Sequence, residues 1–260
     1  MVNLSFSFLD LEYFLLILVR VSCFVFVAPF FSMNNTPRRV RVVFSVFTSV
    51  LLYTSLTPAD GVVYSTELEY AIIVLKEAAA GLIIGFSANI CTAIVNFAGS
   101  VVDMETGLSM VSLMDPASRQ QTSITGVIYQ NVLTLMLIVS GMYRFLLGAL
   151  ADSFLLIPVN GAILRGENLV STIVLFMGDY ISIGFRICLP VFCVILLLNV
   201  VLGVLAKVSP QMNMFAVGMQ LKIIVGLCVL FLTSGMLADA SGFIFSEIRE
   251  LTVAFVEGMM

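Results

Sequence analysis

Long apolar runs without a single charged residue constrain this chain more than any other feature of its sequence. One run extends from Ile187 to Ala206, and others cover Val42–Ala59 and Ala78–Val102. A helix of about 20 residues crosses the roughly 30 Å hydrocarbon core of a bilayer, which is close to the length of each run. Strands in lipid must close into a barrel of short alternating segments, and these runs are continuous and longer. We therefore predict an all-α membrane protein.

The composition excludes many kinds of chemistry. Only 11% of the 260 residues are charged, against about 25% in soluble domains. The absence of histidine removes the Ser-His-Asp and Cys-His catalytic arrangements, the common zinc-protease motif, and histidine-ligated haem or copper. Twelve basic and sixteen acidic residues give a net charge of -4 and form no basic stripe, which disfavours a nucleic-acid partner.

Six apolar segments and one amphipathic end divide the chain. We predict about six long apolar helices, at Leu11–Phe31, Val42–Ala59, Tyr70–Val102, Gln120–Tyr143, Glu167–Lys207 and Met214–Ala238. Asp103–Ser123 and Asp152–Gly166 are predicted as connecting loops. Pro190 is expected to bend or break the fifth helix, because proline removes a helix hydrogen bond and clashes with the preceding turn. The last twenty residues mix charges with apolar positions and predict an amphipathic helix.

Basic residues near segment ends indicate the orientation in the membrane. Arg38, Arg39 and Arg41 follow the first segment, and Lys207 stands in the turn between the last two. Lys and Arg close to membrane spans favour the cytoplasmic side, so we place both connections there and the acidic termini outside.

Small and ionisable residues inside the apolar segments are candidates for special roles. Ala78, Gly81, Gly85 and Ala88 recur at helical spacing, and such a ridge lets another helix approach closely. Charges within membrane segments are costly and are functional candidates by default. The candidate intramembrane charges are Arg20, Lys76, Glu77, Arg186 and Lys222. Structural pairing, an ion or proton path, and contact with another subunit all stay open as their role.

The stretch from Asp103 to Pro116 carries three methionines among small polar residues, between two long apolar helices. Methionine is flexible and packs adaptably, so this loop is suited to lining or closing an irregular opening. An ordinary re-entrant connection packed in protein is an equal alternative from the residues alone.

Several short patterns occur in order along the chain. They are Pro29 and Pro37 followed by Arg39 and Arg41; Lys76-Glu77 with Gly81 and Gly85; Gly99 through Asp103, Gly107-Leu108-Ser109 and Asp115-Pro116; Ser153-Phe154 with Pro158; and Leu198-Asn199 leading to Gly203. The most specific is the run from Ala206 to Phe215, a polar turn with ordered Pro, Gln and Asn between two apolar helices. Together they resemble the FliR family, the R component of the flagellar type III secretion export gate, whose homologue in virulence injectisomes is the T component. The resemblance covers nearly the whole chain.

The resemblance implies a structural, non-enzymatic role without a cofactor or metal. Family members join P and Q subunits in a helical assembly in the bacterial inner membrane, at the flagellar basal body, through which unfolded proteins are exported. The whole chain, 1–260, is then one export-gate unit: residues 1–166 resemble a P subunit of four helices, and residues 167–260 resemble a Q hairpin. Further expected partners are the B and A components of the apparatus and membrane lipid.

The same resemblance assigns roles to two stretches and to three glycines. The loop after the third helix is expected to plug the pore, with Gly107, Met110, Leu113, Met114, Asp115 and Pro116 as its residues. Lys207, Pro210, Gln211 and Asn213 form the turn expected to contact the B component, and Gly81, Gly85 and Gly99 are the packing glycines. The family usually has Phe-Pro where this chain has Met219-Gln220, which softens the break expected there.

Three functions stay open after the sequence. They are a flagellar export-gate subunit, the matching injectisome component, and a self-contained ion-coupled transporter. The first two functions require assembly with other subunits, whereas a self-contained transporter does not.

Overall fold

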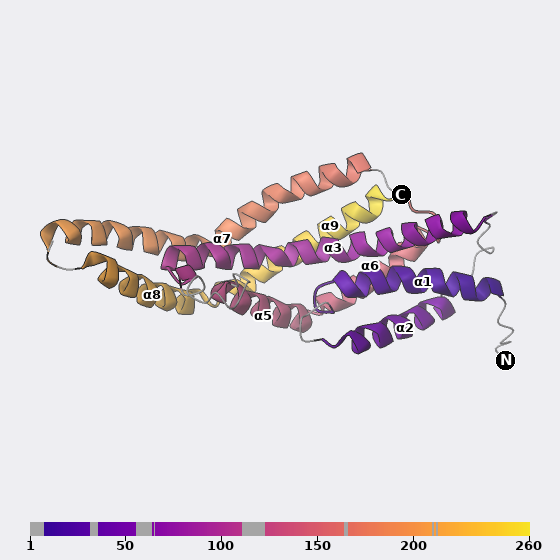
Figure 1. The fold of residues 1–260 in the computed structure, drawn as a ribbon, viewed down its shortest axis with the longest axis horizontal. Helices are drawn as coiled ribbons and strands as arrows, with labels where there is room; N and C mark the ends of the chain where they lie inside the picture. Colours follow the sequence, from indigo (N-terminus) through magenta and orange to yellow (C-terminus); the bar gives the residue numbers. More distant parts are fainter. Residues whose placement is uncertain are drawn as a thin grey trace. The chain divides into compact units, whose positions relative to one another are not determined.

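The structure is a computed structural model, and it describes residues 8–31, 36–55, 64, 66–110, 123–163, 166–209, 211 and 213–260. These residues form eight α-helices and no strand, which confirms the predicted all-α fold (Figure 1). The helices are α1 (Phe8–Val27), α2 (Arg38–Ser55), α3 (Glu67–Thr106), α5 (Ile124–Val139), α6 (Met142–Leu156), α7 (Gly166–Val208), α8 (Met214–Thr233) and α9 (Met236–Gly258).

Among the described residues, three helices are long and apolar enough to cross a membrane: α3, α7 and the Ala216–Thr233 part of α8. Helices α5 and α6 add a fourth span if the pair, bent by 71°, is counted as one. The remaining helices α1, α2 and α9 each contain at least three charged residues. The predicted number of about six long apolar helices is therefore approximate.

The predicted boundaries differ from the observed ones at identifiable places. The fourth predicted helix is two helices, because Gly141 adopts a left-handed conformation with φ of 71° between α5 and α6. Helix α6 then continues to Leu156, into the predicted loop. Helix α7 runs continuously through Pro190, so the helix is not broken there, and the alternative of a bend stays a prediction. Helix α8 is likewise continuous from Met214 past Met219 and Gln220.

The chain divides into two compact units, each built from segments distant in sequence. The first comprises Met1–Cys91, Gly141–Phe176 and Glu247–Met260, and the second comprises Thr92–Ser140 and Met177–Ser246. Helices α3, α7 and α9 each contribute residues to both units. The sequence indicates a different division, into a P-like part at residues 1–166 and a Q-like part at residues 167–260, and that division stays a prediction.

In the first unit, α1 packs against α2 and against the first half of α3 (Figure 1). The packing with α3 depends on two glycines of the ridge. A Cβ on Gly81 would overlap the backbone carbonyl of Arg20, and a Cβ on Gly85 would lie 3.0 Å from the carbonyl oxygen of Phe24. The amide of Asn89 also donates to the carbonyl of Val27 at 2.7 Å. The two helix backbones thus approach as closely as small residues permit.

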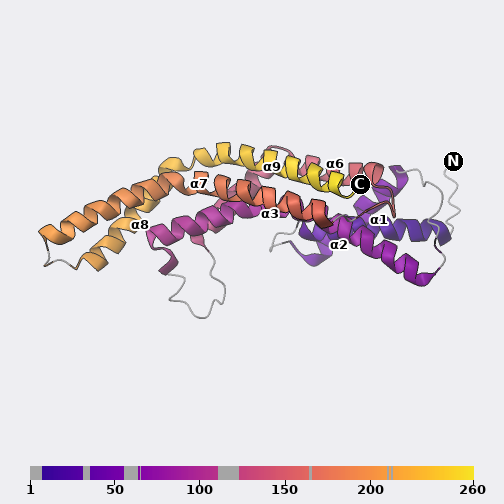
Figure 2. The ribbon, with the colours of Figure 1, turned by 90° about the horizontal axis from the view of Figure 1, so that it is seen from above.

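In the second unit, the core lies between α3 and α7. Ala98 and Val102 of α3 are buried against Cys188, Val191 and Ile195 of α7. Glycine again permits close approaches: a Cβ on Gly99 would overlap the backbone of Gly126 in α5, and a Cβ on Gly226 of α8 would overlap the Thr106 side chain. Beyond this core, α7 and α8 run antiparallel as a hairpin (Figures 1 and 2).

We expect Gly81→Ala to lower the stability of the folded chain by about 1–3 kcal/mol, because α1 must shift to admit the new methyl group. The control is Gly148→Ala in α6, where nothing lies within 4 Å of the added Cβ. That substitution should be neutral or slightly stabilising, since alanine favours helix over glycine. The measurement is the midpoint of thermal unfolding in detergent, and equal midpoints for the two variants would contradict the close contact.

Candidate functional site

A buried ion pair occupies the centre of the first unit. Arg20 of α1 and Glu77 of α3 are both fully buried, and the Arg20 Nε donates to Glu77 Oε2 at 2.6 Å. The Arg20 Nη1 donates to the carbonyl oxygens of Ser153, at 3.1 Å, and Ile157, at 3.0 Å. The other carboxylate oxygen, Oε1, accepts the backbone N–H of Asn160 at 3.0 Å. One ion pair therefore joins α1, α3, the end of α6 and the turn that follows α6.

The surroundings of the pair explain how two charges remain buried. The Arg20 guanidinium carbon lies 4.2 Å from the centre of the Phe154 ring, which gives a cation–π contact on one side. The Arg20 Nη2 has no hydrogen-bond partner among the described residues. Asn160 presents its N–H to Glu77 from a left-handed conformation with φ of 68°. The carboxylate and most of the guanidinium are thus satisfied inside the protein, which a buried pair requires.

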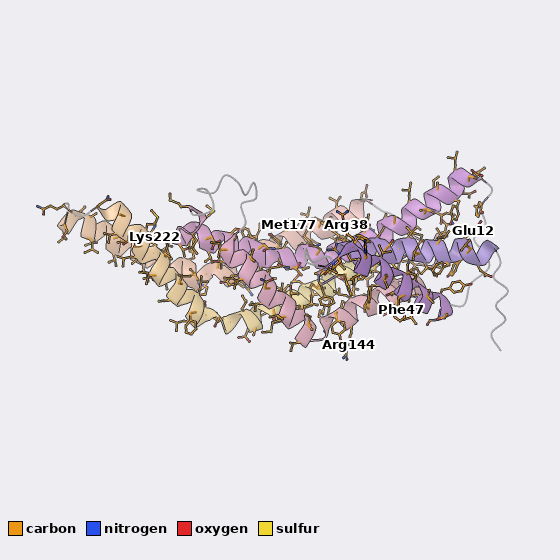
Figure 3. All side chains as sticks on the ribbon, turned by 60° about the horizontal axis from the view of Figure 1, so that its bottom comes forward. Glu12, Arg38, Phe47, Arg144, Met177 and Lys222 are labelled. Atoms are coloured by element: carbon orange, nitrogen blue, oxygen red, sulfur yellow. The ribbon has the colours of Figure 1, made fainter. Side chains whose placement is uncertain are left out.

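The other candidate charges lie in different surroundings. Lys76 and Lys222 are half-buried, while Arg186 is exposed on α7. Lys222 projects from α8 in Figure 3. The structure brings together Arg20 and Glu77, two of the five candidates, and joins none of the other three in an ion pair with a described residue.

A second arrangement ties together the two ends of the loop that follows α3. Asp103 is buried near the end of α3, and its carboxylate accepts the Ser123 hydroxyl at 2.8 Å and the backbone N–H of Thr125 at 3.2 Å. The Thr125 hydroxyl donates to the same carboxylate. Ser123 in turn caps the start of α5 by accepting the N–H of Gly126 at 2.8 Å. The end of α3 and the start of α5 are therefore held together on either side of the loop.

The described start of this loop lies beside the α7–α8 hairpin. Gly107, with φ of 84°, turns the chain, and a Cβ there would lie 3.8 Å from the Met219 side chain of α8. Gly107 and Met110 line a groove of about 410 Å³ together with Met219 and Lys222. Met110 is 47% exposed. The other four predicted plug residues, Leu113, Met114, Asp115 and Pro116, lie outside the described residues.

The predicted contact turn is exposed where the structure describes it. Lys207 stands in the last turn of α7, and Gln211 and Asn213 follow it. Asn213 caps α8 by accepting the N–H of Ala216 at 3.4 Å. Pro210 lies outside the described residues. A cationic side chain and an exposed amide are thus presented at the tip of an apolar hairpin.

The two arrangements join helices within each unit through buried charges. The described residues contain no group of three or more Cys, Asp or Glu side chains placed to hold a metal ion. Sequence reasoning missed the role of Asp103 as the anchor of both loop ends. The signal available was Asp103 itself at the end of an apolar run, with Ser123 and Thr125 at the start of the next.

Comparison with known proteins gives a consistent likeness over nearly the full length. Residues 11–248 match the model of a family described as bacterial export proteins, family 1. The chain is 31% identical over 220 residues to the flagellar biosynthetic protein FliR of Bacillus subtilis (strain 168), covering 84% of each chain. It is 26% identical over 235 residues to FliR of Escherichia coli (strain K12), covering 90% of this chain and 88% of that one. It is 27% identical over 247 residues to FliR of Aquifex aeolicus (strain VF5), covering 92% and 91%.

We expect Glu77→Leu to destabilise the chain by about 3–5 kcal/mol, because Arg20 is then a buried charge without a counter-ion. The double variant Arg20→Met/Glu77→Leu should recover much of this loss, since both charges are removed together. The test compares the unfolding midpoints of Glu77→Leu, Arg20→Met and the double variant. The control is Arg144→Met, because Arg144 is exposed. A double variant no more stable than Glu77→Leu would show that the pair does not act as a unit.

Proposed function

The chain belongs to family 1 of the bacterial export proteins, and from this we propose that it is the R subunit of the flagellar export gate in the inner membrane at the basal body. The observation that carries the proposal is the family match over residues 11–248, supported by likeness to proteins named FliR over 84% and 92% of this chain. Those relatives carry flagellar names, which favours a flagellum over an injectisome. The three candidate spans agree with a membrane location.

Assembly with P and Q subunits is supported by the apolar surface of the second unit. Only 22% of the apolar window in α7 and 11% of that in α8 is buried within the chain, against 56% in α3. Exposed apolar patches of this extent mark contact with lipid or with other proteins. Antiparallel α7 and α8 form the hairpin that is expected to match a Q subunit, and residues 1–166 are expected to match a P subunit.

The loop after α3 is proposed to plug the pore. Its two ends are held by Asp103, so a loop of flexible methionine and leucine side chains can act from a fixed base. A gate that passes an unfolded chain and retains ions needs a deformable apolar seal, and hydrophobic constrictions close by excluding water. Met110, Leu113 and Met114 are the proposed closing residues.

The exposed turn at Lys207 and Gln211 is the proposed contact for the B component, and the A component and unfolded exported proteins are the other proposed partners. The Gln211 amide and the Lys207 ammonium group are both exposed at the tip of the hairpin, so they can contact a polar surface of a partner. No specific observation favours the transporter alternative, because the described charged residues form no chain of paired groups across the spans.

Native mass spectrometry tests the assembly. The affinity-tagged chain is co-expressed with its genomic neighbours and extracted in mild detergent. We expect one copy of this chain in a large complex with several copies of two smaller membrane proteins. Photo-crosslinkers at Lys207 and Gln211 should capture a third protein, whereas one at Leu155 of α6 should not. A lone monomer or a small homo-oligomer would refute the gate assignment.

Replacing both Leu113 and Met114 with glycine should make the membrane leak ions, because the apolar seal loses its side chains. The measurement is the rate of inner-membrane depolarisation in a strain whose gate is fully assembled. Ile163→Gly is the matched control, since Ile163 is an exposed apolar loop residue of the first unit. An unchanged rate for the double glycine variant would remove the plug assignment and leave the assembly proposal standing.

A further inference from the structure

A small apolar pocket opens in the second unit, between α5, α7 and the start of α9. Its volume is about 150 Å³, and its lining includes Tyr129 of α5, Pro190 of α7, and Met236 and Phe243 of α9. Tyr129 is buried, whereas Met236 and Phe243 are 56% and 57% exposed. The pocket is therefore closed on its inner side and reachable from outside. Its size suits a length of hydrocarbon chain.

Two residues of opposite charge line the same pocket and form no ion pair with each other. Arg186 of α7 and Asp239 of α9 are both lining residues, and both are exposed. No ion pair joins either of them to another residue in the part of the chain that the structure describes. The pocket is therefore bordered by one cationic and one anionic side chain.

Arg186 and Asp239 lie about one hydrocarbon thickness along the hairpin from its turn. Arg186 directly precedes the charge-free run Ile187–Ala206, and Lys207 directly follows it. Twenty helical residues span about 30 Å, the thickness of the hydrocarbon core. Helix α8 then returns from the Lys207 turn and ends at Thr233, shortly before Asp239. Arg186 and Asp239 therefore share one end of the hairpin, opposite the turn.

We propose that this pocket binds one zwitterionic aminophospholipid, of the phosphatidylethanolamine type. Part of an acyl chain fills the apolar pocket, and the phosphate accepts from the Arg186 guanidinium. The ammonium group donates to the Asp239 carboxylate. An anionic lipid such as phosphatidylglycerol satisfies Arg186 but places no cation beside Asp239, so charge complementarity favours the zwitterion. The binding does not depend on the export-gate assignment, only on the chain lying in a membrane.

The test uses the full chain, purified in mild detergent with whatever subunits it retains. Dioleoyl phosphatidylethanolamine and dioleoyl phosphatidylglycerol are added at equal concentration, and retained lipids are counted by native mass spectrometry. We expect one tightly held phosphatidylethanolamine. Arg186→Gln should weaken retention of both lipids by about tenfold, because a charge-assisted contact is lost. Asp239→Asn should abolish the preference for the zwitterion. Ala240 also lines the pocket, so Ala240→Phe should fill it and remove both lipids.

The matched control is Asp179→Asn, an exposed carboxylate on the same helix as Arg186 that does not line the pocket. It should bind lipid as the unaltered chain does. Because a variant can fail to fold, a photoactivatable phosphatidylethanolamine is also applied to the unaltered chain, and it should label the segment that contains Phe243. Equal retention in all variants, no preference between the two lipids, or capture of a protein subunit by a crosslinker at Phe243 would each overturn the proposal.

Discussion

The first unit depends on the ion pair between Arg20 and Glu77. Two charges without access to water are tolerated only when their hydrogen bonds are satisfied, and removing either partner leaves the other uncompensated. The pair must therefore form with α1, α3 and the end of α6 in their correct places, since Ser153 and Ile157 supply the remaining acceptors. Gly81 makes this possible, because it admits the Arg20 backbone against α3 one turn beyond Glu77. The ridge of small residues and the buried charges are thus two aspects of one contact: the glycine brings the helices together and the pair fixes their register.

In the second unit, close glycine contacts and a buried charge occur together again, here at the two ends of a loop. Gly99 and Gly126 let α3 and α5 approach closely, and Asp103 then accepts from the first residues at the start of α5. A buried carboxylate that receives backbone and hydroxyl donors fixes both ends of a connection at one place. For a loop that is proposed to plug a pore, such an anchor fixes the place at which both of its ends join the helices. The Met219 side chain beside Gly107 also places the hairpin next to the start of the loop, at the position where the family usually has Phe-Pro.

The sequence predicted those features that depend on neighbours along the chain. Continuous apolar runs predicted the helices, and their spacing predicted the ridge at Gly81 and Gly85. Features that depend on contacts between distant segments were not predictable: Arg20 and Glu77 are 57 residues apart, and nothing in either segment specifies the other as partner. The same reason explains the boundary errors. Helix α3 continues to Thr106, and its buried Asp103 accepts hydrogen bonds from Ser123 and Thr125 at the start of α5. Helix α7 passes Pro190 without a break, since a single missing hydrogen bond is a local loss within a helix of 43 residues.

The exposed apolar faces of α7 and α8 decide what kind of function the chain can have. In water such faces would drive aggregation, so the folded chain requires lipid or other subunits over most of the hairpin. Lipid and protein make different demands on such a surface. A protein neighbour needs polar or small residues that fix its position on the apolar surface. The exposed Lys207 turn and the groove beside Gly107 are suited to that role. A lipid needs an apolar recess bordered by charges, and the pocket lined by Arg186 and Asp239 has both, at the other end of the hairpin. The two ends of one hairpin are thus suited to different neighbours, because charges border the same charge-free run on both sides.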